Sequence, residues 1–163
     1  SVIPFTVMVL ANNQRSSSYT APNTPSYKDD NPSNPESAGD GRSYPIRINN
    51  PSIANSNSAA TIMYGIELTE NYTAIYLALK NEVYEQAYYN INPNTWLVDS
   101  MSGVKYKLIS TENCAISPEK SILEYNNIAE FVLYFEPLPA DTSRVDLIEA
   151  GDNAWRFQGI QLN

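Results

Sequence analysis

The stretch IMYGIELTENYTAIYLALKN, residues 62–81, decides the fold class. Ile62, Tyr64, Ile66 and Leu68 occupy every second position of its first half. Ile75, Leu77 and Leu79 do the same in its second half. Alternation with a period of two is typical of a β-strand with one buried face. The turn-like Thr69-Glu70-Asn71-Tyr72 separates the halves, so the stretch predicts a β-hairpin. We expect one face to hold Ile62, Tyr64, Ile66 and Leu68, and the facing strand to present Ile75, Leu77 and Leu79.

Shorter runs of the same kind follow along the chain. They cover Tyr88–Ile91, Trp96–Val98, Val104–Leu108, Phe131–Phe135, Val145–Leu147 and Trp155–Leu162. The last run changes phase at Gly159, where a β-bulge would return the later residues to the inward face. Pro118–Tyr125 is the one segment expected to be helical. Short strands at this spacing predict an all-β antiparallel sandwich of seven or eight strands.

The N-terminal part of the chain has a different composition. Residues 1–11, SVIPFTVMVLA, form an apolar ribbon, whereas the Pro/Ser/Asn-rich residues 12–43 contain no Val, Ile, Leu, Met, Phe or Trp. A segment without large apolar side chains gains little by folding, so residues 12–43 are expected to be an extended polar tether. The expected organisation is an N-terminal extended strand (1–11), a tether (12–43) and a β-sandwich domain (44–163).

Three interpretations of residues 1–11 remain open. The ribbon is the remnant of an export signal with Val9 and Ala11 at a small-residue cleavage site, a strand of its own sandwich, or a strand donated to another copy. The long tether argues against simple pairing within one compact domain. In the donor interpretation each buried apolar side chain contributes about 1.5–3 kcal/mol. The interface residues would then be Val2, Ile3, Phe5, Val7, Val9 and Leu10.

Composition narrows the function classes. The chain carries 18 acidic and 10 basic residues, a net charge of −8, and we therefore expect no nucleic acid partner. It has no histidine, which removes the commonest general base and the usual zinc ligand. The single Cys114 is expected to pack as a small apolar side chain. We expect no membrane span, metal or cofactor.

Carboxylate pairs offer little support for catalysis. Glu67 with Glu70, and Asp146 with Glu149, have the residue types of a glycosidase pair. Residues three apart on a strand point to opposite faces, so the second pair cannot act as a local unit. The EAGDN stretch, residues 149–153, lacks a complete calcium-loop spacing and is expected to be a solvated turn. The chain is therefore not expected to be an enzyme.

Aromatic residues and short motifs raise the question of sugars. The chain has 12 tyrosines and two tryptophans. Trp155 is expected in the core, whereas Trp96 follows a turn-like Asn-Pro-Asn and is the candidate for stacking on a glycan. Asn71-Tyr72-Thr73 is an N-glycosylation sequon, and Asp99-Ser100-Met101 resembles an O-glycosylation acceptor. Asn71 and Ser100 are thus candidate glycosylation sites.

The C-terminal stretch FVLYFEPLPADTSRVDLIEAGDNAWRFQGIQL, residues 131–162, resembles known modules when it is taken with the 62–81 hairpin. Together they resemble immunoglobulin-like β-sandwich modules of secreted and surface proteins of Bacteroidetes-type bacteria. The resemblance implies an immunoglobulin-like fold, export and a non-catalytic accessory or adhesive role. It transfers no catalytic residue.

These observations lead to two functional expectations. The first is a secreted or cell-surface structural protein that forms a filament or surface layer. Its partners are copies of itself, because head-to-tail strand exchange propagates unless the rotation closes. The alternative is a secreted accessory or adhesion module with a glycan or protein ligand, whose N-terminal ribbon is only an export signal.

Overall fold

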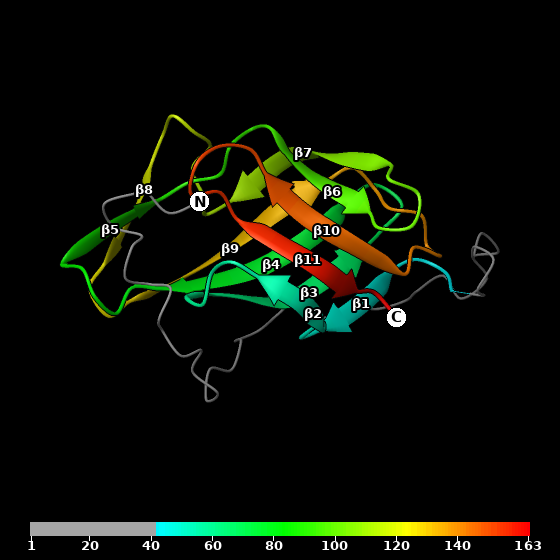
Figure 1. Ribbon diagram of the computed structural model, residues 1–163, viewed down its shortest axis with the longest axis horizontal. Helices are drawn as coiled ribbons and strands as arrows, with labels where there is room; N and C mark the ends of the chain where they lie inside the picture. The colour runs from blue at the N-terminus through cyan, green and yellow to red at the C-terminus, as the bar shows by residue number, and fades with distance from the viewer. Residues whose placement is uncertain (1–41) are drawn as a thin grey trace.

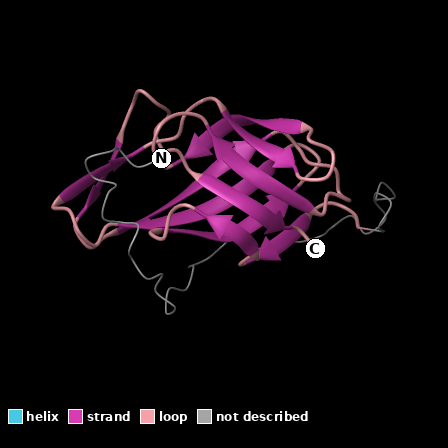
Figure 2. Ribbon diagram, viewed as in Figure 1, coloured by secondary structure: helices cyan, strands magenta, loops and turns pink. Residues whose placement is uncertain are grey.

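The computed structural model describes residues 42–163, and all regular structure in this range is β (Figures 1 and 2). This confirms the all-β prediction. No helix in these residues is long and apolar enough to cross a membrane. The strands are β1 (Ile46–Asn49), β2 (Ile53–Ser56), β3 (Thr61–Leu68), β4 (Thr73–Lys80), β5 (Gln86–Tyr89), β6 (Thr95–Asp99), β7 (Lys105–Glu112), β8 (Ser121–Glu124), β9 (Ile128–Phe135), β10 (Arg144–Glu149) and β11 (Arg156–Gln161).

Nine strands form one antiparallel sheet in the order β1-β3-β4-β9-β7-β6-β10-β11-β2, and β5 pairs with β8. The sheet curls over so that β10 and β11 lie in front of β3, β4 and β9 (Figure 1). β7 belongs to both layers, because Lys105–Lys107 pair with β6 and Leu108–Glu112 pair with β9. The result is a sandwich-like body whose two layers are parts of one continuous sheet.

The core lies between these layers. Its largest fully buried side chains include Phe131, Phe135 and Phe157. Trp155 is only 2% exposed and stacks on Phe131 with the ring centroids 5.6 Å apart, and its indole N–H donates to Thr61 Oγ1 at 3.1 Å. The prediction that Trp155 is a core residue is confirmed. Such a ring buries a large apolar surface while its polar atom keeps a partner.

The predicted hairpin is present as β3 and β4, but the predicted face of β3 is wrong. The register shifts by a bulge between Met63 and Gly65. Ile66 and Leu68 face the main core, as does Met63, whereas Ile62 and Tyr64 join a second cluster on the opposite side of the sheet. One extra residue in a strand inverts the phase of the side chains that follow it.

The bulge expected at Gly159 is confirmed. Val145 pairs with Ile160 and Leu147 pairs with Phe157, so two residues of β11 lie opposite Asp146. Gly159 adopts a φ of 69°, and its N–H donates to Asp146 Oδ1 at 2.8 Å. Phe157 and Ile160 are both buried as a result.

The prediction of a helix over Pro118–Tyr125 is wrong. Ser121–Glu124 form β8, which pairs with β5 and buries Leu123. A two-turn helix on its own is only marginally stable, whereas pairing with β5 satisfies the backbone hydrogen-bonding groups of β8. Residues 42–163 contain eleven strands where the spacing predicted seven or eight, and the additional ones, β1, β2 and β8, have four residues each.

Residues 1–41 lie outside the described range. The expected N-terminal strand, with Val2, Ile3, Phe5, Val7, Val9 and Leu10, falls there, as does all of the tether except Arg42 and Ser43. The assignment of these segments stays a prediction.

Candidate functional site

The two ends of the curled sheet leave strand edges without partners. β1 pairs with β3 only from Gly65 to Leu68, so within residues 42–163 the first part of β3 has a strand partner only on its β4 side. β2 pairs with β11, and its other edge has no strand partner in the same range. We call the space between β2 and the Thr61–Met63 segment of β3 the open seam.

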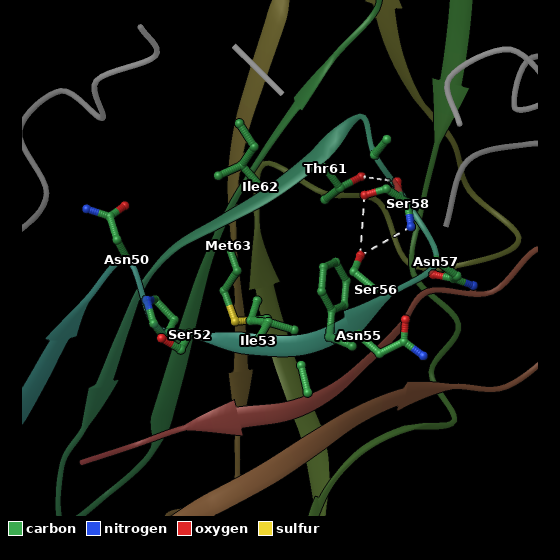
Figure 3. A pocket seen from close by; sticks show the side chains of 14 residues that line it. Asn50, Ser52, Ile53, Asn55, Ser56, Asn57, Ser58, Thr61, Ile62 and Met63 are labelled. Atoms are coloured by element: carbon green, nitrogen blue, oxygen red, sulfur yellow. Dashed lines mark hydrogen bonds between the residues drawn. The ribbon is translucent and has the colours of Figure 1, made fainter. Parts of the chain in front are cut away.

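A cavity of about 770 Å³ occupies the open seam (Figure 3). Its lining residues are 50–59, 61–63 and Phe157. The volume lies in the usual range of ligand sites, about 300–1,000 Å³. Met63 and Phe157 are 4% and 1% exposed and belong to the main core, and Ile53 packs against that core. The cavity therefore has an apolar floor that is continuous with the core.

The cavity rim is polar. Asn50, Ser52, Asn55, Ser56 and Asn57 come from β2 and its flanking residues, and all are exposed. Asn57 is fixed in place, because its Nδ2 donates to the carbonyl of Ala154 at 2.7 Å and its Oδ1 accepts from the N–H of Arg156 at 3.0 Å. The rim thus presents amide and hydroxyl groups around an apolar floor.

The described lining of the cavity carries no ionisable side chain. None of the 14 residues that line the cavity is acidic, basic or a cysteine. Acid–base or metal chemistry has no groups to use there. Unpaired strand edges, in contrast, are templates for an added strand, which gains main-chain hydrogen bonds from its neighbours. An added strand in the open seam would have β2 on one side and β3 on the other.

The predicted carboxylate pair Asp146 and Glu149 is divided between two faces. Asp146 points outward to Gly159, whereas Glu149 is 1% exposed and accepts hydrogen bonds from the N–H groups of Asn92 and Trp155, each at 2.8 Å. This confirms that the two carboxylates do not form a local unit. Within the described range no three His, Cys, Asp or Glu side chains are grouped closely enough to hold a metal ion.

The other pair, Glu67 and Glu70, lies outside the open seam. Glu67 is buried on β3, and Glu70 is exposed in the turn that follows. Cys114 is buried as predicted, and this burial raises the pKa of its thiol to about 12. A thiol with such a high pKa stays protonated and is a poor nucleophile at neutral pH.

The candidate glycan residues are dispersed over the molecule. Trp96 is half-buried on β6 with Lys105 Nζ 5.7 Å from its ring centroid. Asn71 is exposed in the β3–β4 turn. The Ser100 hydroxyl donates to Asp146 Oδ1 at 3.3 Å. None of the three lines the open seam, and their roles stay predictions.

No family model, curated protein or solved structure matches this chain. Sequence reasoning missed the seam because β1 and β2 are four-residue strands, too short for a clear periodic signal. The isolated isoleucines in IRIN and IANS are the only local hint that these runs are strands.

Proposed function

We propose that this chain is a non-enzymatic, extracellular structural protein whose copies assemble by strand exchange into a filament or surface layer. In this proposal the open seam of one subunit receives residues 2–10 of a neighbour. The observation that carries the proposal is the pair of strand edges, β2 and the start of β3, that have no strand partner within residues 42–163 and lie above an apolar floor.

The N-terminal sequence suits such a seam. In an extended strand Ile3, Phe5, Val7 and Val9 share one face, which is the face offered to Met63 and the rest of the floor. The tether supplies the reach, since it spans roughly 100 Å when extended at about 3.3 Å per residue. Because donor and acceptor are different surfaces of the subunit, the contact is head-to-tail and propagates unless the rotation closes a ring.

The proposal includes an immunoglobulin-like relationship and the export that the sequence resemblance implies. Support comes from the order β11-β10-β6-β7, which corresponds to the order G-F-C-C′ of immunoglobulin variable domains. β4 is an addition to that plan, because it separates β3 from β9 in the other layer. The relationship is therefore one of architecture with an inserted strand.

Mixed cysteine variants test the exchange directly. One chain carries Phe5→Cys, Val7→Cys or Val9→Cys, and the other carries Ser56→Cys on the rim of the seam, both in a Cys114→Ala background. We expect a disulfide between the two different chains, because only neighbouring strands bring Cα atoms within about 4.4–6.8 Å. Ser110→Cys, exposed on β7, is the matched control. The proposal is wrong if no arm position reacts with Ser56→Cys above that control.

The same set of variants separates exchange from closure within one chain. A chain that carries both Val7→Cys and Ser56→Cys would form an internal disulfide and stay monomeric if the arm filled its own seam. We expect disulfide-linked multimers instead, visible on non-reducing gels and by electron microscopy. A monomeric product from every double variant would contradict assembly.

A second candidate is an accessory binding or adhesion module with a glycan or protein ligand. The amides and hydroxyls around the seam favour it, because such groups orient polar ligands over an apolar floor. Removal of residues 1–11 distinguishes the two candidates. An assembling subunit would become monomeric and poorly soluble with its seam empty, whereas a binding module would stay monodisperse and keep its ligand affinity.

A further inference from the structure

A second apolar surface covers the outer side of β3, β4 and β9. We call it the tyrosine face, and it consists of Tyr64, Tyr72, Ala74, Tyr76, Ala78 and Tyr134, with Ile62 and Val132 packed against them. Tyr64, Ala74, Tyr76 and Ala78 are at most 7% exposed, so the face is covered in the full chain. The Tyr64 and Tyr76 ring centroids are 6.0 Å apart, and those of Tyr72 and Tyr134 are 5.3 Å apart. The main core lies on the opposite side of this sheet, so the face is not needed to hold the two layers together.

Arg47 of β1 lies across the tyrosine face. Its guanidinium carbon is 4.5 Å from the Tyr76 ring centroid, and its Nε donates to Asn49 Oδ1 at 3.0 Å. Gly65 makes room for it, since a Cβ at that position would be only 2.4 Å from Nη2. Nη1 and Nη2 are buried and have no hydrogen-bond acceptor among the described residues. Buried donors of this kind are costly unless an acceptor is added.

Within residues 42–163, no carboxylate near this face accepts a hydrogen bond from Nη1 or Nη2 of Arg47. Glu67 lies directly opposite Arg47 in the β1–β3 register, yet it does not accept from Nη1 or Nη2. Glu112 instead accepts a hydrogen bond from the Tyr134 hydroxyl. The buried guanidinium therefore lacks a carboxylate partner within residues 42–163, and a carboxylate is the partner that an arginine fork binds best.

We propose that the tyrosine face docks the chain's own proline-rich segment, residues 22–40, and that an acidic side chain of that segment binds Arg47. The segment, PNTPSYKDDNPSNPESAGD, contains four prolines and four acidic residues. Proline-rich segments favour the polyproline II conformation and bind aromatic-lined surfaces at a low entropic cost. The tyrosine rings suit the prolines of the segment, and Arg47 suits its acidic residues.

Chain continuity favours this occupant over a separate partner. Arg42 donates to the carbonyl groups of Leu162 and Thr142, at 2.5 and 2.7 Å, and this fixes the place where the segment joins the sheet. The Tyr44 hydroxyl donates to the Leu138 carbonyl, and the Leu138 N–H donates to Thr73 Oγ1, beside Tyr72. The junction thus lies near the Tyr72 end of the tyrosine face.

The segment is also long enough to cross that face. In polyproline II, 19 residues extend about 60 Å at about 3.1 Å per residue. The eight residues of β4 extend only about 27 Å at about 3.4 Å per residue. A short connection gives an effective concentration in the millimolar range, so the segment would outcompete free peptides of similar sequence. The proposal does not depend on strand exchange at the open seam.

A spin label tests this docking in the full chain. The label is placed at Ser33→Cys in a Cys114→Ala background, and alanine methyl signals are recorded by NMR. We expect the Ala74 and Ala78 methyls to lose most of their intensity, whereas the Ala54 methyl on β2 keeps its intensity. Equal broadening of Ala54, Ala74 and Ala78 would overturn the proposal, since it would report a segment without a preferred surface.

Two further measurements establish which contacts and which chain are involved. Two variants should each restore at least half of the lost methyl intensity. The first is Arg47→Met, and the second replaces Pro22, Pro25, Pro32 and Pro35 together by alanine. In a mixture of spin-labelled chains with unlabelled, isotope-enriched chains, the Ala74 and Ala78 signals should stay sharp. Broadening in that mixture would contradict docking by the chain's own segment and would point to the segment of a second copy.

Discussion

Glu149 and Trp155 are joined by two hydrogen bonds across the loop between β10 and β11. The Glu149 N–H donates to the Trp155 carbonyl at 3.1 Å, and the Glu149 carboxylate accepts from the Trp155 N–H at 2.8 Å. The second carboxylate oxygen accepts from the N–H of Asn92, in the segment before β6. One buried acid thereby ties two loops to the sheet that carries the core tryptophan.

Removal of this acid should destabilise the domain. Glu149→Ala leaves two backbone donors unsatisfied in the interior, and we expect the free energy of unfolding to fall by about 2–4 kcal/mol. Glu149→Gln should cost less, because one acceptor oxygen remains. Urea denaturation measures both. Glu82→Ala, which breaks the partly exposed pair with Lys80, is the control and should change stability by about 1 kcal/mol or less. Equal effects of Glu149→Ala and Glu82→Ala would refute the assigned role.

A Cβ at the β11 bulge should be poorly tolerated. In Gly159→Ala the new atom would lie 2.7 Å from the Cβ of Ala54, at a φ of 69°. Gly103→Ala has a similar φ of 79° but meets no atom within 4 Å, so it measures the backbone term alone, about 1–2 kcal/mol. We expect Gly159→Ala to be more destabilising than Gly103→Ala, and Ala54→Gly to recover the difference. Thermal unfolding of these three variants and of the double variant with Gly159→Ala and Ala54→Gly decides the point. Additive effects of the two substitutions in the double variant would show that no clash exists.

Alkaline pH should destabilise the fold, because a buried tyrosine hydroxyl and a buried cysteine thiol must ionise. Burial raises the pKa of Tyr64 from its ordinary 10.0 to about 12, and that of Cys114 from 9.0 to about 12. Both groups hold their protons more tightly when folded, so above pH 9 the unfolded state binds fewer protons than the native state. Their contribution is therefore complete below pH 9 and is lost as the pH rises to about 12.

Denaturation series at pH 8, 10 and 11 check this dependence. We expect the urea midpoint to fall between pH 8 and pH 11, and to fall less in a variant with Tyr64→Phe and Cys114→Ala. Tyr125→Phe, an exposed position, serves as the control and should leave the slope unchanged. An identical slope in all three proteins would show that these groups do not control the alkaline limit.

The two tryptophans should respond differently to solvent quenchers. Trp155 is 2% exposed, whereas Trp96 lies half-buried on the surface of β6. We expect acrylamide to quench Trp96 severalfold more strongly than Trp155. Trp96→Phe should remove the accessible component and leave the shielded one. If a glycan stacks on Trp96, its addition should protect that component, and unchanged quenching with every sugar tested would speak against this residue as a platform.

Asn81 should not tolerate an isosteric acid. The side chain is fully buried, with Nδ2 donating to the carbonyl groups of Tyr84 and Leu123, at 2.9 and 3.0 Å, and Oδ1 accepting from Val83 and Tyr84. Asn81→Asp would place an oxygen against two carbonyls, which should cost about 2–4 kcal/mol. Asn94→Asp, at an exposed position, is the comparison. Urea denaturation should show a loss for Asn81→Asp alone.

Local patterns were sufficient where a strand follows regular alternation or breaks it visibly. The hairpin of β3 and β4, the bulge at Gly159 and the burial of Trp155 were all predicted from such patterns. The bulge between Met63 and Gly65 was missed because the sequence stays apolar through it, so no phase change marks the position. β8 was misread as helical because its pairing with β5 is a tertiary interaction that residues 118–125 do not encode.

The candidate site was less accessible to sequence reasoning than the fold. The sequence predicted an apolar N-terminal strand, but it did not predict the strand edges that border the open seam. An edge arises from the order of all strands in the sheet, and β2 becomes an edge only because β11 returns beside it. Arg47 was missed for the same reason, since nothing in IRIN shows that a tyrosine ring lies beneath its guanidinium.

The pairing of β2 with β11 has a consequence for biogenesis. Asn55 and Gln158, which face each other in these strands, are 103 residues apart in the chain. During synthesis β1, β3 and β4 emerge early and can pair with one another, whereas β2 must wait for β11 to leave the ribosome. A nascent chain that has not yet exposed β11 therefore lacks the β2 side of the open seam, and under the proposed strand exchange it could not receive a donor strand. This built-in delay would keep unfinished chains out of an assembly.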